Sequence, residues 1–152
     1  MPDILHRVGI AAEPLRIFEA LSSMEGIRGW WDADAQGDAT EGSAFDFAGG
    51  RMDVAEATPG LVRWRYSGPA ADWVGTEVQI QLVPRDGQTF VLFTHADWRE
   101  PTEFMHHCST KWATYLVSLK GLVEHGEGRP NPHDVQISVG TDASQKPGTE
   151  HA

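Results

Sequence analysis

Aromatic side chains are the residues of this sequence whose types and spacing best suit contact with an apolar molecule. The chain holds six tryptophans, and ligand sites are lined mainly by aromatic and apolar side chains with a few polar groups among them. Phe45 and Phe47 alternate on one expected strand, so both project to one side. Cys108 and Trp112 are four residues apart, on one side of an expected helix. The predicted ligand-binding residues are Phe45, Phe47, Trp64, Tyr66, Phe93, His95, Cys108 and Trp112, with Trp30, Trp31 and Trp98 near the mouth.

Polar groups among these rings would decide what the site recognises. His95 and the hydroxyl of Tyr66 are the expected anchors, because a buried polar tip needs a partner that a ligand oxygen can supply. His95 could also act as an acid or base, or simply be a neutral histidine satisfied by one internal hydrogen bond. A catalytic role would require a carboxylate beside it, such as Asp97, Glu103 or Asp53. No convergent acid, base and nucleophile is evident, so we predict no catalytic residues.

Other reactive residues do not form a recognisable site. His106, His107 and Cys108 are consecutive on an expected helix and therefore face different directions. Their spacing is not that of a zinc site, and Cys108 is best explained as a small buried hydrophobe. The acidic residues of the loop 32–38 are explained by solvation, although weak Ca²⁺ binding is conceivable there. We predict no metal site and no cofactor.

Composition excludes several classes of partner. The formal net charge is −10, which disfavours nucleic acids and anionic membrane surfaces because both are bound by clusters of Lys and Arg. A single cysteine permits no intrachain disulfide. No apolar run approaches the roughly 20 residues needed to cross a bilayer, and the N-terminus lacks the apolar stretch of a signal peptide. We expect one domain in the cytoplasm.

Periodicity predicts an α+β arrangement. A short strand comes first, two short helices follow, and a meander of antiparallel strands leads to one long helix near residues 101–124. The expected elements are a strand over 4–10, helices between Pro14 and Ser22 and over 24–31, and strands between residues 43 and 95 that are separated by Gly49-Gly50, Pro59-Gly60 and Asp86-Gly87. Residues 127–152 have the composition of a tail. Within it Val135, Ile137 and Val139 alternate, which suggests a docked strand that could also add to a sheet edge in a homodimer.

Particular residues at both ends of the domain carry a family resemblance. They are Ala12-Glu13-Pro14, Phe18, Leu21 and Ile27–Trp31 at the opening, and His95, Trp112, Leu116 and Leu119–Gly126 at the close. The opening resembles the START-like (SRPBCC, helix-grip) superfamily, and the closing part resembles its Hsp90-ATPase-activator-homologue (AHSA1-like) branch. The resemblance covers roughly residues 3–126 and implies a curved sheet of six or seven antiparallel strands around the long helix. We therefore predict a helix-grip domain over 1–126 and a tail over 127–152.

Three functions are compatible with these features. The one we favour is a binding module that holds a small apolar molecule between sheet and helix. The second is an enzyme that uses the same cavity for cyclisation, dehydration or hydrolysis, as some helix-grip relatives do. The third is a chaperone-associated protein of the stress response. Each ring alone is also explained by core packing, so the prediction rests on the set.

Overall fold

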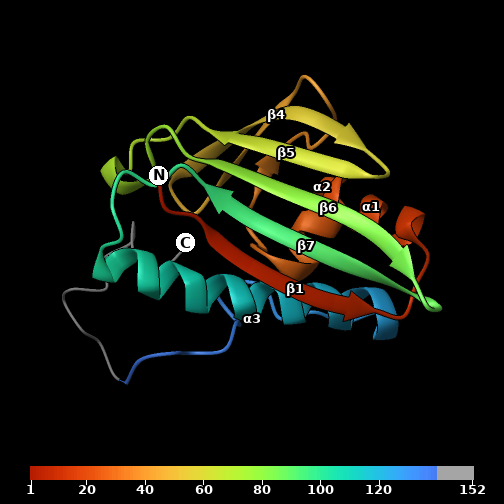
Figure 1. The fold of residues 1–152 in the computed structure, drawn as a ribbon. Coiled ribbons are helices and arrows are strands. Elements are labelled where there is room, and N and C mark those ends of the chain that lie inside the picture. The colour runs from red at the N-terminus through yellow and green to blue at the C-terminus, as the bar shows by residue number, and fades with distance from the viewer. Residues whose placement is uncertain (140–152) are drawn as a thin grey trace.

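The computed structural model describes residues 1–139. Its seven strands form one antiparallel sheet in the order β1-β7-β6-β5-β4-β3-β2. From β2 to β7 each strand pairs with the next along the chain, and β1 returns to the far edge beside β7 (Figure 1). The strands are β1 Ile4–Ile10, β2 Gln36–Gly37, β3 Ala44–Phe47, β4 Gly50–Thr58, β5 Leu61–Tyr66, β6 Glu77–Arg85 and β7 Gln88–Ala96.

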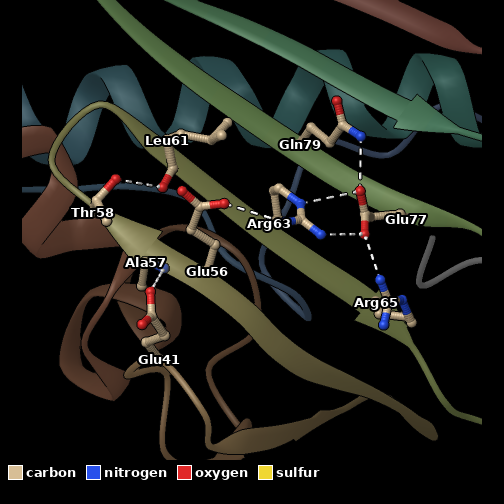
Figure 2. A network of polar contacts seen from close by, with 9 residues as sticks. All are labelled: Glu41, Glu56, Ala57, Thr58, Leu61, Arg63, Arg65, Glu77 and Gln79. Atoms are coloured by element: carbon tan, nitrogen blue, oxygen red, sulfur yellow. Dashed lines mark hydrogen bonds and ion pairs between the residues drawn. The ribbon is translucent and has the colours of Figure 1, made fainter.

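One face of this sheet is buried and the other is polar, as period-2 alternation requires. On β5, Trp64 is fully buried while its neighbours turn outward. On the outer face Arg63 lies between Glu56 of β4 and Glu77 of β6, and Glu77 also accepts from Arg65 and Gln79 (Figure 2). Opposite charges on adjacent strands stabilise a sheet modestly, so this network marks the outer face as a solvated surface.

In the part of the chain that the structure describes, three α-helices cover the buried face. They are α1 Pro14–Leu21, α2 Met24–Trp30 and α3 Glu103–His125, with a short 3₁₀ turn, η1, over Ala71–Trp73. The side chain of Thr102 accepts from the backbone N–H of Met105 at the start of α3, and Gly126 ends the helix with a φ of 82°, a conformation that glycine adopts without strain. Figure 1 shows α3 running along the β1 edge, with α1 and α2 behind the sheet. The predicted helix-grip fold is confirmed.

Side chains of α3 form hydrogen bonds with backbone groups at the β1 edge of the sheet. Lys120 donates to the carbonyl of Gly9, and the carboxylate of Glu124 accepts from the backbone N–H of Ala11 at 2.8 Å. The hydrogen bond from Ala11, followed by the one from Lys120, lowers the pKa of Glu124. The edge of β1 is therefore covered by the helix that packs beside it.

Residues 127–139, called here the strap, run back along α3. The backbone N–H of Arg129 donates to Ser118 at 2.6 Å, and further along the strap Asp134 meets Lys111. Because residue numbers rise along the strap as they fall along α3, the two segments are antiparallel. Asn131 fastens the strap to the loop after α2, donating to the carbonyl of Trp31 at 2.8 Å.

Val135, Ile137 and Val139 form no docked strand in the described residues, so that prediction is wrong. Their addition to a sheet edge in a homodimer stays a prediction. The strap lies against a helix rather than a sheet edge, so it has no backbone ladder to join. Val139 is 98% exposed, which leaves its side chain without a packing partner. The remainder of the predicted tail, residues 140–152, lies outside the described part of the chain.

Candidate functional site

The predicted ligand-binding residues meet in one aromatic cluster between the sheet and α3. Trp31 lies at its centre, with ring centroids 4.5 Å from Phe47, 5.5 Å from Trp64 and 5.1 Å from Trp112. Separations of this order are typical of favourable aromatic pairs. Every predicted residue is buried, with a side chain 7% exposed or less. The set is Phe45, Phe47, Trp64, Tyr66, Phe93, His95, Cys108, Trp112, Trp30, Trp31 and Trp98.

The rings pack against one another in the region where the sequence predicts a ligand. Trp30, Trp31 and Trp98 were expected near a mouth but are 0–1% exposed, like the walls. Strand parity correctly placed the side chains on the inner face, but it carries no information on how far opposing rings approach.

His95 is held by a directed chain of hydrogen bonds. The indole N–H of Trp112 donates to Nδ1 of His95 at 3.1 Å, so Nδ1 is the unprotonated nitrogen. Nε2 must then carry the proton and donate to the hydroxyl of Thr76 at 2.9 Å, which in turn donates to the carbonyl of Trp73 at 2.7 Å. Burial lowers the pKa of His95 to about 3. The imidazole is thus a neutral, fully paired group.

The two polar anchors expected from the sequence are both engaged within the protein. Both nitrogens of His95 are used, and within residues 1–139 its hydrogen-bond partners include no carboxylate. The hydroxyl of Tyr66 accepts from the backbone N–H of Ala70 at 3.0 Å. Burial raises the pKa of Tyr66, and the hydrogen bond from Ala70 opposes that rise. The arrangement of His95 matches the alternative reading, a histidine satisfied internally.

Trp73 belongs to the cluster but was not among the predicted residues. It is 3% exposed, and its ring lies 4.5 Å from His95 and 5.9 Å from Phe47 between centroids. It comes from η1, in a stretch rich in Gly, Pro and Ala that has neither helix nor strand periodicity. The only signal in the sequence for placing Trp73 in the cluster is its large apolar side chain. Its indole N–H lies toward the thiol of Cys108, whose pKa is raised by burial.

Buried indole N–H groups are the unusual polar feature of this cluster. Within residues 1–139, those of Trp64 and Trp98 have no acceptor. Trp73 has only the sulfur of Cys108, which is a weak acceptor. Buried donors are almost always paired, and an unpaired one calls for an explanation. Trp64 belongs to β5, Trp73 to η1 and Trp98 to the loop before α3.

One small pocket on the surface reaches this cluster at the end of β7. Its volume is about 100 Å³ and its lining is Ala71, Asp72, Trp98, Arg99 and Glu100. Asp97, just before Trp98, has a φ of 69°, and the side chain of Trp98 is buried. Through Trp98 the pocket reaches the cluster beside η1 and the loop before α3.

The acidic loop after α2 supports the structure and does not gather metal ligands. Asp32 is buried, and its carboxylate accepts from the backbone N–H groups of Asp34 at 3.0 Å and Ala48 at 2.8 Å. In the described part of the chain, no group of three or more His, Cys, Asp or Glu is placed to hold a metal ion. None of the helices described there is both long and apolar enough to cross a membrane.

Comparisons with known proteins now bear on this geometry. A family model described as "Activator of Hsp90 ATPase homolog 1-like protein" matches residues 11–124. The chain belongs to this family. Among solved structures, the AHSA1-like chain is similar to one described as the Aha1 dimer from Colwellia psychrerythraea, with 42% identity, a TM-score of 0.77, and coverage of 84% of this chain and 100% of that one. Comparison with curated proteins found no match.

More distant structures share the fold alone. SSP2350 from Staphylococcus saprophyticus is 19% identical, with a TM-score of 0.70 over 85% of this chain and 97% of that one. CalU16 from Micromonospora echinospora is also 19% identical, with a TM-score of 0.70 over 95% of this chain and 78% of that one. These likenesses support the helix-grip architecture of the AHSA1-like domain.

A buried ion pair joins the AHSA1-like domain to the strap. Lys111 on α3 contacts the carboxylate of Asp134, and their side chains are 5% and 3% exposed. The hydroxyl of Tyr115, one turn further along α3, donates to the same carboxylate oxygen at 3.2 Å. This group could not be found from the sequence, because nothing in the composition of the tail links Asp134 to a position on the helix.

Proposed function

We propose that this AHSA1-like domain binds a small, largely apolar molecule between the sheet and α3. The observation that carries the proposal is a cluster of aromatic rings that contains indole N–H groups, those of Trp64 and Trp98, without an acceptor. A buried donor left unpaired costs about 1–3 kcal/mol. A guest with one oxygen acceptor would recover that cost while its apolar body contacts the rings.

Entry is proposed at the end of the cluster formed by η1 and the loop before α3. Trp98 lines the surface pocket there, and its indole reaches inward to Trp73, at 6.2 Å between ring centroids. η1 is a single short turn. Movement of η1 and Trp98 would admit a guest without breaking the sheet, because neither belongs to the strand ladder.

Binding without catalysis suits the reactive groups of the cluster. His95 is neutral above its pKa of about 3 and both its nitrogens are paired. Burial keeps the thiol of Cys108 protonated by raising its pKa. A general base needs a free lone pair and a nucleophilic cysteine needs its thiolate, and neither side chain offers these.

Tryptophan fluorescence offers the test, since the emitting rings would contact the guest. A panel of phenols, hydrophobic acids and sterol-like compounds is titrated into the wild type, C108W and V117W. Cys108 is fully buried in the cluster, whereas Val117 is 62% exposed on the same helix. We expect C108W to fill the site and weaken binding by about tenfold or more, a loss of about 1.4 kcal/mol. V117W is expected to bind as the wild type does.

A more conservative variant keeps the test valid if C108W misfolds. W98F keeps an aromatic ring and removes one unpaired donor. W98F should weaken the binding of phenols and acids more than the binding of a pure hydrocarbon of the same size. Unchanged affinities in both folded variants would place any binding site elsewhere.

A second proposal concerns self-association. The 42% identical structure from Colwellia psychrerythraea is described as a dimer, and this observation favours a homodimer for the present chain. Sedimentation equilibrium at micromolar concentration tests it, and a monomer mass would reject it. An Hsp90 partner, suggested by the family description, is tested separately by the ATPase rate of Hsp90 with and without this protein.

A further inference from the structure

Two donors on adjacent turns of α3 converge on a single carboxylate oxygen. The ammonium of Lys111 and the hydroxyl of Tyr115 both reach Oδ2 of Asp134. Positions four apart on a helix lie on the same face, so the helix itself sets the spacing of these donors. A cation and a phenol aimed at one oxygen form a carboxylate-binding arrangement, because charge-assisted hydrogen bonds are the strong ones.

The carboxylate comes from a separate part of the chain. Lys111 and Tyr115 fall within the family match over residues 11–124, whereas Asp134 lies in the strap beyond it. A buried ammonium needs an anionic partner. The helix therefore presents a site for an anion, and the strap supplies one.

The strap is held by few backbone hydrogen bonds. Asn131 donates to the carbonyl of Trp31 at 2.8 Å and accepts from the N–H of Ala33 at 2.9 Å, and Arg129 donates to Ser118. In the described residues the strap contains no helix or strand element. Segments of this kind open locally at a lower free-energy cost than the core.

The anion site adjoins the aromatic cluster. The ring of Tyr115 lies 6.4 Å from that of Trp112 between centroids, and Trp112 contacts Trp31 at 5.1 Å. The backbone of Trp31 is also where Asn131 fastens the strap. A molecule in place of the strap would thus meet a cation and a phenol at one end and indole rings at the other.

We propose that Lys111 and Tyr115 bind the carboxylate of an apolar acid, and that Asp134 occupies this subsite while the strap is docked. The proposal rests on ligand binding in the aromatic cluster and names its ligand class as amphipathic carboxylic acids. Acid and strap compete for the same donors. The apparent affinity for the acid is therefore reduced by the fraction of molecules in which the strap is docked.

A matched pair of probes tests the competition, with decanoate as the acid and decan-1-ol as its uncharged counterpart. In full-length D134A the internal carboxylate is gone, so decanoate should bind about tenfold or more tightly than to the wild type, while decan-1-ol changes by less than about twofold. K111M/D134A removes the ammonium as well and should lose the preference for decanoate. Equal gains for both probes in D134A, or no gain for either, would overturn the proposal.

Hydrogen exchange in the wild type keeps the test independent of how well D134A folds. Saturating decanoate should raise amide exchange at residues 129–135, and decan-1-ol should not. Unchanged exchange with bound decanoate rejects strap displacement. If decan-1-ol quenches tryptophan fluorescence and decanoate shows no strap effect, only the acid subsite fails. If neither probe binds any variant, ligand binding in the cluster fails with it.

Discussion

Trp112 donates its indole N–H to Nδ1 of His95 across 3.1 Å and thereby links the middle of α3 to the end of β7. Its ring also lies 4.6 Å from Phe93 between centroids. One side chain thus contributes both an apolar contact and a hydrogen bond between the long helix and β7. The same bond fixes the tautomer of His95, on which the hydrogen bond to Thr76 depends.

Replacing Trp112 should destabilise the fold strongly. W112A is expected to lower the free energy of unfolding by about 3–5 kcal/mol, the range for truncating a large buried aromatic. W112F retains a ring and should lose less, although Nδ1 of His95 then lacks its donor. Urea denaturation followed by circular dichroism measures both, and an unchanged midpoint for W112A would contradict the central position of this residue.

Acid should destabilise the protein through His95. Its pKa is lowered from 6.5 to about 3 in the fold, so the unfolded chain takes up a proton before the folded one does. The contribution is fully present above pH 6.5 and falls by roughly 1 kcal/mol per pH unit as the pH drops toward 3. Unfolding free energies at several pH values measure the slope. H95Q, which cannot titrate, should show a shallower slope, and equal slopes would refute this assignment.

Replacing only one partner of the Lys111–Asp134 pair should destabilise the fold more than replacing both. K111M leaves the carboxylate of Asp134 buried without its cation, and we expect the free energy of unfolding to fall by about 3–5 kcal/mol. K111M/D134L replaces both charges by apolar groups and should recover most of that loss. R63A, on the outer face, serves as the comparison and should cost about 1 kcal/mol or less. Thermal melts of the four proteins decide the ranking.

Gly128 should be needed for the strap to dock. A Cβ at this position would lie 2.3 Å from the carbonyl oxygen of Gly29, a backbone atom that cannot rotate away. G128A should therefore lift the start of the strap while leaving the sheet intact. Faster proteolysis of residues 127–139 with an unchanged far-ultraviolet spectrum is the expected result, and protection equal to wild type would show that the strap accommodates the methyl group.

The sequence predicts those parts of this fold that obey a regular period. His95 could be placed inward because it shares strand parity with Phe93, and α3 could be bounded because its apolar stripe ends at Gly126. Trp73 could not be placed, since a 3₁₀ turn imposes no period long enough to detect. The pairing of Lys111 with Asp134 could not be predicted either, because it depends on the path of an irregular segment. The closeness of the rings is likewise a property of three-dimensional packing.

The covering of β1 by α3 has a consequence for aggregation. Unpaired backbone groups on an edge strand are the template on which further chains add as cross-β layers. Here the carbonyl of Gly9 and the N–H of Ala11 are bonded to Lys120 and Glu124, while the opposite edge is β2, only two residues long. We expect fibril growth from the native protein to require α3 to separate from β1 first. The free energy of that local opening, rather than of global unfolding, then sets how long a concentrated solution stays clear.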